Sequence, residues 1–141
     1  FNADLEVGKI YRKDKKTFIK LKKNLSKYIY SFPVDKNEIS KAILVNNSNL
    51  KKIIKIVHLE VRKKLRRFLK KYKNEKFVIL DIPLLLEGKI NKRRDILLFV
   101  EAKKKDINKR LKKRHNFNAG IIKKLKILKQ YGTHSKNQKK K

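Results

Sequence analysis

Apolar residues recur every three or four positions through much of the chain, which is the spacing of one helix face. The pattern is clearest over residues 49–72, where we predict a long amphipathic helix with Ser48 as a candidate cap. Its apolar face consists of Leu50, Ile53, Ile54, Val57, Val61, Leu65, Phe68 and Tyr72. The opposite face is almost entirely lysine and arginine, which is typical of a solvated surface.

Other segments with this spacing predict shorter helices. A pattern over residues 14–30 predicts a helix that ends before Pro33, because the residue preceding a proline avoids helical angles. Residues 5–13 are predicted to begin with a helix or turn. Residues 105–114 and 118–129 are predicted as two further helices.

Two short apolar segments lack helical spacing and predict strands. Residues 77–82 and 96–100 are apolar without alternation, so both faces of each strand are expected to be buried in a parallel sheet. Pro83 stops the first ladder because proline has no amide hydrogen. Residues 1–4 are interpreted as the end of another buried strand. Strands that alternate with helices in this way predict an α/β fold.

The apolar pattern ends near residue 130 and divides the chain into two parts. Residues 1–130 are predicted to form one domain, and the lysine-rich residues 131–141 a disordered basic tail. No apolar run reaches the roughly 18 residues of a membrane span, and residues 1–10 do not resemble a signal peptide. We therefore expect a cytoplasmic monomer that has no membrane partner.

The composition restricts function mainly through charge. The formal net charge is +31, so the chain should attract polyanions such as nucleic acids non-specifically. Lysine greatly outnumbers arginine, whereas proteins that read nucleic acids favour arginine. We attribute most of the lysine excess to an AT-rich genome. Cysteine is absent from the sequence, which excludes disulfides and thiolate metal sites.

Asp81 is the residue with the clearest candidate chemistry. It lies near the end of the predicted strand 77–82, and ligands of open α/β sheets bind beyond the carboxyl ends of strands. A carboxylate there can reach a magnesium ion or a substrate hydroxyl. An aspartate that only forms a turn or caps a helix is the alternative, and position alone leaves both open.

The residues around Asp81 resemble a segment of the dephospho-coenzyme A (dephospho-CoA) kinases. Residues 81–87 read Asp-Ile-Pro-Leu-Leu-Leu-Glu and resemble the family's D-(V/I)-P-L-L-(F/L)-E. Four shorter segments resemble family segments in the same order: residues 2–4, 56–62, 95–100 and 110–114. They are similar to the family's (D/N)-A-D, its I-x-H-P-x-V-R, its following strand and its R-L-x-x-R lid helix. The resemblance extends over residues 1–128.

This resemblance implies a fold and a reaction. The fold is α/β, a P-loop NTPase-like three-layer parallel sheet with a helical substrate-binding insertion. The family transfers the γ-phosphoryl group of ATP, with Mg²⁺, to the ribose 3′-hydroxyl of dephospho-CoA in the last step of coenzyme A synthesis. By resemblance, the helical substrate region covers residues 14–73, the core strands residues 77–100 and the lid residues 104–117.

Individual roles also follow from the resemblance. Asp4 is the candidate catalytic base for the acceptor hydroxyl. The candidate substrate-binding residues are His58, Arg62, Asp81, Pro83 and Leu84. Arg110 and Arg114 share one helix face and are the candidate ligands of the ATP phosphates. Simple solvation is the alternative for His58 and for both lid arginines. No residue is assigned as a metal ligand.

The chain departs from the family pattern in two ways. Leu59 replaces the family's proline, Gly8 replaces a histidine, and Lys36-Asn37 replaces a frequent Asp-Arg pair. In addition, neither of the Gly-Lys pairs has the other residues of a P-loop, G-x-x-x-x-G-K-[ST]. We therefore expect that the first strand and P-loop precede this sequence, so the sheet is incomplete and the chain alone has negligible kinase activity.

Two other functions remain open from the sequence. A basic RNA- or ribosome-associated protein would bind nucleic acid with a steep dependence on salt. A different small-molecule kinase of the P-loop class would phosphorylate another acceptor.

Overall fold

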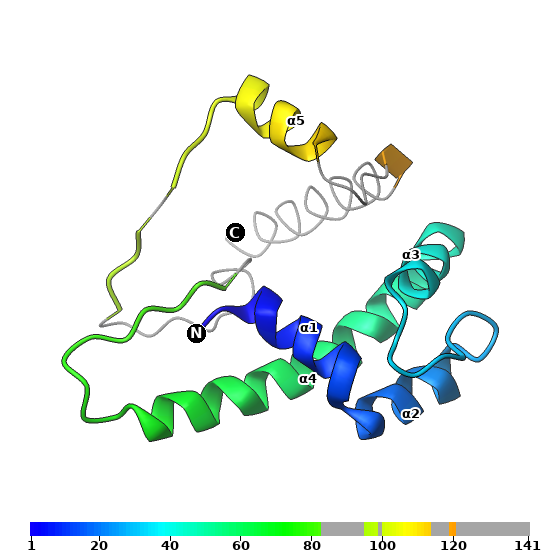
Figure 1. The fold of residues 1–141 in the computed structure, drawn as a ribbon, viewed down its shortest axis with the longest axis horizontal. Coiled ribbons are helices and arrows are strands. Elements are labelled where there is room, and N and C mark those ends of the chain that lie inside the picture. The colour runs from blue at the N-terminus through cyan, green and yellow to red at the C-terminus, as the bar shows by residue number, and fades with distance from the viewer. Residues whose placement is uncertain (83–94, 99, 114–118, 121–141) are drawn as a thin grey trace, which may run out of the picture. The chain divides into compact units, whose positions relative to one another are not determined.

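The computed structural model describes residues 1–82, 95–98, 100–113 and 119–120. Its helices are α1 (Ala3–Lys13), α2 (Lys15–Asn24), α3 (Lys36–Val45), α4 (Asn47–Lys71) and α5 (Lys104–Lys112). The chain divides into two compact units, Phe1–Leu84 and Leu85–Lys141, so α1 to α4 belong to the first and α5 to the second. Figure 1 shows α1, α2 and α3 gathered along α4.

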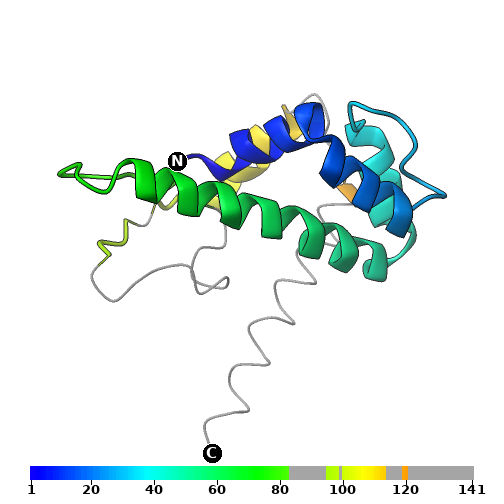
Figure 2. The ribbon, with the colours of Figure 1, turned by 90° about the horizontal axis from the view of Figure 1, so that it is seen from below.

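Helix α4 is the support on which α1, α2 and α3 pack (Figure 2). The apolar side chains that it buries most deeply, each at most 5% exposed, are Leu50, Ile53, Val57 and Leu65. The helix begins after Asn46, whose side-chain oxygen accepts a hydrogen bond from the Ser48 amide at 2.7 Å. The predicted helix 49–72 is thus confirmed. Its cap, however, is Asn46 and not Ser48, because the extended backbone of Asn46 turns its side chain over the first amides.

Helices α1 and α2 meet at a corner formed by Asp14. The backbone amide of Asp14 donates to the carbonyl of Ile10 at 3.0 Å, which closes the last turn of α1. The carboxylate of Asp14 accepts hydrogen bonds from the Thr17 amide at 3.0 Å and the Thr17 hydroxyl at 2.9 Å. Thr17 is almost fully buried, so the same carboxylate starts α2 and satisfies a hydroxyl shielded from water.

The helix predicted over residues 14–30 ends earlier than expected, at Asn24. Leu25 leaves the helical region with φ −141°. Leu25 and Ile29 are nonetheless both buried in the core of the first unit. The apolar spacing continues beyond the helix because a non-helical turn after Leu25 brings Ile29 into the same core.

Helix α3 has no counterpart in the sequence prediction. Asp35 starts it by accepting a hydrogen bond from the Asn37 amide at 2.8 Å. Glu38 in its first turn is buried, and its carboxylate accepts hydrogen bonds from the Tyr30 amide at 3.0 Å and the Ser31 amide at 3.4 Å. Asp35 followed by Glu38 is a sequence signal for a helix start that could have identified α3.

The two predicted strands are not buried on both faces. Residues 77–82 pair with the N-terminus through one parallel bridge, and Phe77 and Ile79 are 78% and 81% exposed. In the second predicted strand, Ile96, Leu98 and Val100 are 86%, 89% and 97% exposed, and Leu97 is 39% exposed. Among the described residues, no further strand covers these faces. The expectation of burial is therefore wrong for this chain, and the arrangement of the sheet stays a prediction.

Helix α5 confirms the helix predicted over residues 105–114, to within two residues at each end. Pro83, Leu84, Arg114, most of the predicted helix 118–129 and the predicted tail 131–141 lie outside the described residues. The domain boundary at residue 130 and the lid over residues 104–117 stay predictions. In the described part of the chain, no helix combines the length and the apolar character that crossing a membrane requires.

Candidate functional site

The end of segment 77–82 pairs with the residues that start α1. The Asp81 amide donates to the Phe1 carbonyl at 2.8 Å, and the Ala3 amide donates to the Asp81 carbonyl at 2.9 Å. The amino terminus of Phe1 donates to the Ile79 carbonyl at 2.7 Å. This parallel pairing places Asp81 beside the residues that precede Asp4, in an isolated bridge, and the predicted strand end at Asp81 stays a prediction.

The side chain of Asn2 connects α1 to Asp81. Its Oδ1 accepts a hydrogen bond from the Leu5 amide at 2.9 Å and so caps α1. Its Nδ2 donates to Oδ2 of Asp81 at 2.7 Å. Sequence analysis did not assign a role to Asn2, since the partner that gives it one is 79 residues away along the chain.

Asp4 lies in the first turn of α1 and is exposed. The first turn is the positive end of the helix dipole, which favours a carboxylate there. Asp4 follows Ala3, whose amide bonds to Asp81, so the two predicted aspartates come from neighbouring backbone segments. The structure therefore places the backbone segments that carry these two predicted site residues side by side.

The rings of Phe1, Phe68 and Tyr72 fix this pairing to the C-terminal part of α4. The ring centroids of Phe1 and Phe68 are 5.4 Å apart, and those of Phe68 and Tyr72 are 4.7 Å apart. Such tilted aromatic contacts each contribute on the order of 1 kcal/mol beyond burial of area. The start of α1 is therefore held on α4 by ring packing as well as by backbone hydrogen bonds.

His58 and Arg62 lie four residues apart on α4 and share one face of it. Partial burial lowers the pKa of His58 below its ordinary 6.5, and the positive charge of Arg62 lowers it further. His58 is consequently mainly neutral at pH 7 and can accept or donate one hydrogen bond without carrying charge. Both residues precede the Phe68 anchor along α4.

Arg110 lies on α5 and is exposed. It belongs to the second compact unit and stands in the last turn of the helix, where a positive charge interacts favourably with the helix dipole. The predicted partner Arg114, together with Pro83 and Leu84, lies outside the described residues. Their roles stay predictions.

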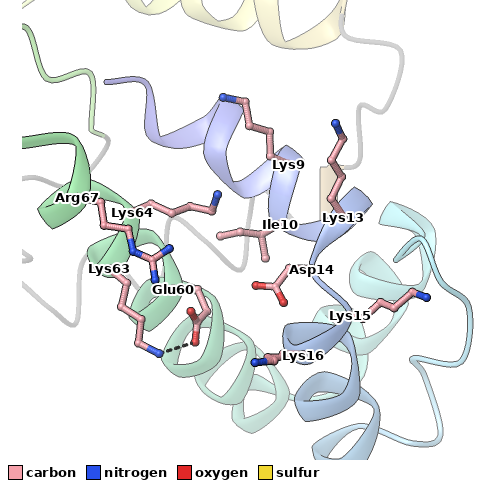
Figure 3. A pocket seen from close by; sticks show the side chains of 10 residues that line it. All are labelled: Lys9, Ile10, Lys13, Asp14, Lys15, Lys16, Glu60, Lys63, Lys64 and Arg67. Carbon is pink, nitrogen blue, oxygen red and sulfur yellow. Dashed lines mark hydrogen bonds and ion pairs between the residues drawn. The ribbon is translucent and has the colours of Figure 1, made fainter. Parts of the chain in front are cut away.

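A separate feature of the first unit is a basic groove of about 530 Å³ between α1, α2 and α4. Its lining residues are Lys9, Ile10, Lys13, Asp14, Lys15, Lys16, Glu60, Lys63, Lys64 and Arg67. Figure 3 shows the carboxylates of Asp14 and Glu60 between the helices, while Lys9, Lys13 and Lys15 extend outward. The groove thus has an acidic centre and a basic rim.

The two central carboxylates are held in the charged form. A hydrogen bond from Lys63, at 3.0 Å, is the main cause that lowers the pKa of Glu60. Burial raises the pKa of Asp14, but the hydrogen bonds from Thr17, another from the Lys16 backbone and the positive charge of Lys64 together lower it overall. Within the groove, Glu60 therefore pairs with basic side chains, and Asp14 caps α2.

The groove contains none of the predicted site residues. Glu60 lines it, and Arg62 is two positions later, which on a helix is a rotation of about 200°. His58 and Arg62 therefore project from the other flank of α4. In the described part of the chain, no three His, Cys, Asp or Glu side chains form a group that could hold a metal ion.

Comparison with known proteins decides the family. The model of the dephospho-CoA kinase family matches residues 2–140. The chain belongs to the dephospho-CoA kinase family. Membership in this family implies the P-loop NTPase fold class, as the sequence predicts, although the described residues form helices and a single bridge.

Individual dephospho-CoA kinases support this assignment. That of Wolbachia sp. subsp. Brugia malayi (strain TRS) is 35% identical over 104 residues, which are 72% of this chain and 53% of that protein. That of Bartonella henselae is 34% identical over 111 residues, with coverage of 72% and 53%. That of Bacillus anthracis is 34% identical over 87 residues, with coverage of 60% and 44%.

The chain spans about half the length of the curated dephospho-CoA kinases it matches. No solved structure matches it. All of the predicted site residues fall inside the range matched by the family model. Family membership is thereby established, while the role of each residue and the activity of this chain are proposals.

Proposed function

We propose that this chain carries the acceptor-binding part of a dephospho-CoA kinase, an enzyme that transfers the γ-phosphoryl group of ATP to the ribose 3′-hydroxyl of dephospho-CoA. The observation that supports this best is the parallel pairing of residues 1–3 with residues 79–81. It brings the backbone segments that carry Asp4 and Asp81 side by side. Two carboxylates carried by neighbouring segments suit an acceptor hydroxyl that must be oriented and deprotonated.

In this proposal Asp4 accepts the proton of the 3′-hydroxyl, and Asp81 orients the ribose by accepting a hydrogen bond. His58 and Arg62 bind the remainder of dephospho-CoA from the exposed flank of α4. The neutral His58 supplies a hydrogen bond, and Arg62 supplies a fixed positive charge. Pro83 and Leu84 complete the substrate pocket.

Mg²⁺ would enter the site together with ATP. The ion is bound through one or two carboxylates together with phosphates and water, and in the described part of the chain no three His, Cys, Asp or Glu side chains form a group that could hold it alone. When bound with ATP, the ion neutralises charge on the phosphoryl oxygens. Arg110 and Arg114 would contact the ATP phosphates from the lid, and the chain's strands would form part of a three-layer sheet.

We infer further that the 141-residue chain binds dephospho-CoA but does not transfer phosphate by itself. The sequence contains no G-x-x-x-x-G-K-[ST] segment whose amides could cradle the ATP phosphates. Binding of the acceptor and transfer of phosphate can therefore be measured separately on the same protein.

The first prediction concerns acceptor binding by the purified chain in isothermal titration calorimetry. We expect saturable binding of dephospho-CoA, and we expect Asp81→Asn to weaken it about tenfold, since hydrogen bonds to charged groups contribute about 1.5–3 kcal/mol. The matched control is Glu75→Gln, which neutralises an exposed carboxylate just beyond α4 and should leave affinity unchanged.

Three outcomes would count against the proposal. Absence of dephospho-CoA binding would exclude the acceptor-binding role. Equal binding of other nucleosides would favour a kinase with a different acceptor. Transfer of labelled phosphate from ATP to dephospho-CoA by the chain alone would contradict the inferred lack of phosphoryl transfer.

A further inference from the structure

The orientation of the Asn2 side chain is fixed by chemistry on both sides. An amide has one face that only accepts hydrogen bonds and one that only donates them. The Leu5 amide requires the acceptor face, at 2.9 Å, and the Asp81 carboxylate requires the donor face, at 2.7 Å. Asn2 therefore joins the N-terminus of α1 to one particular oxygen of Asp81.

This contact leaves the two oxygens of Asp81 in different situations. Oδ2 accepts the hydrogen bond from Asn2, and Oδ1 accepts none from the residues that the structure describes. Asp81 is exposed, so Oδ1 can be reached by a ligand. The backbone of Asp81 is also held at both its amide and its carbonyl by residues 1–3. A side chain fixed at these points has little freedom left.

We propose that Asn2 is a positioning residue, which holds Asp81 so that its Oδ1 faces the acceptor hydroxyl of dephospho-CoA. This inference rests on the proposed function, in which Asp81 binds the acceptor. Asn2 does not touch the substrate itself. It acts through Asp81 and through α1, the helix that carries Asp4.

In this chain the residue at position 2 is an amide, where the family's segment has either aspartate or asparagine. Aspartate would still cap α1, since aspartate and asparagine are equally good caps. It could not donate a hydrogen bond to Asp81, and two carboxylates at that separation repel each other or share a proton. Asn2→Asp therefore removes the contact with Asp81 while it preserves the start of the helix.

The experiment is a double-mutant cycle on dephospho-CoA affinity with Asn2→Asp, Asp81→Asn and both together. Each single variant should bind about tenfold more weakly. Asn2→Asp loses the hydrogen bond to Asp81, whereas Asp81→Asn keeps it through its one oxygen but turns its NH2 group, which cannot accept a proton, toward the acceptor hydroxyl. In the double variant the amide at position 81 donates to the acid at position 2 and turns its own oxygen to the ligand. Affinity should return to within about threefold of the original, against about a hundredfold loss if the effects added.

The substitution Asp81→Asn should thus weaken binding of dephospho-CoA when residue 2 is asparagine. The same substitution should restore binding when residue 2 is aspartate. A double variant that shows the additive loss would overturn the proposal, as would an unchanged affinity for Asn2→Asp. Circular dichroism controls for folding, because all four proteins keep a cap on α1. If Asp81→Asn alone has no effect, the substrate role of Asp81 is wrong and the proposal fails with it.

A second measurement separates the positioning role from the proposed function. The side-chain amide signals of Asn2 in nuclear magnetic resonance should move in the variant Asp81→Ala, because it has no acceptor for the Asn2 amide. Asp4 and the amino terminus of Phe1 are the other charged groups beside Asn2, and Asp4→Ala is the matched control. A chain that binds no dephospho-CoA yet shows this movement would retain the Asn2–Asp81 contact and lose only the proposed function. Asn2 amide signals that do not move when Asp81 is changed would contradict the hydrogen bond between Asn2 and Asp81.

Discussion

At the scale of single residues, short polar side chains decide where the helices of this chain begin. Asn2, Asp14, Asp35 and Asn46 each accept a hydrogen bond from an amide of the first turn of α1, α2, α3 and α4. Such caps typically contribute about 1 kcal/mol each. Two of them have a second task, since Asn2 also holds Asp81 and Asp14 also satisfies the buried Thr17 hydroxyl.

Asp14→Ala should be costly because of this second task. The variant loses the cap of α2 and leaves the buried hydroxyl of Thr17 without its acceptor, so we expect a loss of about 2–3 kcal/mol in the free energy of unfolding. Urea unfolding followed by circular dichroism measures it. Asp14→Asn keeps an acceptor oxygen and should lose less than half as much. Equal losses for the two variants would show that the hydrogen bonds do not matter.

The difference in unfolding free energy between the original chain and Asp14→Asn should also depend on pH. Folding lowers the pKa of Asp14 from its ordinary 3.8, so its ionised form contributes stability above that pH and loses it as pH falls through the lower folded value. The stability difference between the original chain and Asp14→Asn should therefore be full at pH 7 and shrink below about pH 4. A difference that stays constant down to pH 2 would contradict this.

At the scale of elements, the buried face of α4 organises the first unit. Helices α1, α2 and α3 each contact α4, and its buried residues follow the helical spacing through much of its length. The polar contacts between these helices include partly exposed ion pairs, such as that between Lys64 and Glu6 at 3.2 Å, and a buried hydrogen bond from the Asn49 side chain to the Ala42 carbonyl at 3.0 Å. Ion pairs near the surface contribute little, so apolar packing on α4 dominates.

Two leucines of α4 allow a matched test of this conclusion. Leu65 is 5% exposed and Leu59 is 47% exposed. Leu65→Ala should lower the free energy of unfolding by about 2–4 kcal/mol, because it leaves a cavity in the packed interface. The same substitution at Leu59 should cost less than about 1 kcal/mol, since a surface change leaves no cavity. Chemical denaturation of both variants decides, and equal costs would contradict the packing of α4.

At the scale of the whole molecule, a charge of +31 is the dominant property outside the candidate site. A charge of this size attracts polyanions at long range without requiring a shaped binding surface. In the groove, among the described residues, Lys13, Lys15, Lys16 and Arg67 form no ion pair. Its centre, however, holds two charged acids, which disfavour a phosphate there. We therefore propose non-specific binding of nucleic acid and not a dedicated site.

Fluorescence anisotropy with labelled RNA and DNA tests this proposal. Affinity should be similar for both polymers and should fall at least about tenfold between 50 and 200 mM salt, as counterion release requires. Replacing Lys15 and Lys16 in the groove by glutamine should weaken binding no more than replacing Lys103 and Lys104 near α5. A preference for one RNA sequence at high salt, or a loss confined to the groove variant, would favour the RNA-binding function instead.

The sequence by itself determined the long helix α4, the short helix α5 and the resemblance of residues 81–87 to the family. These depend on interactions within a few residues, where apolar spacing and cap residues carry the information. Only the tertiary structure decided that Leu25 ends α2, that α3 follows the Asp35 cap, and that Asn2 bonds to Asp81. Each of these depends on what a segment meets in space, and no local pattern specifies a partner 79 residues away. The exposed faces of residues 77–82 show the same limit. Their apolar sequence indicates that they can be buried, but it does not specify the segment that would cover them.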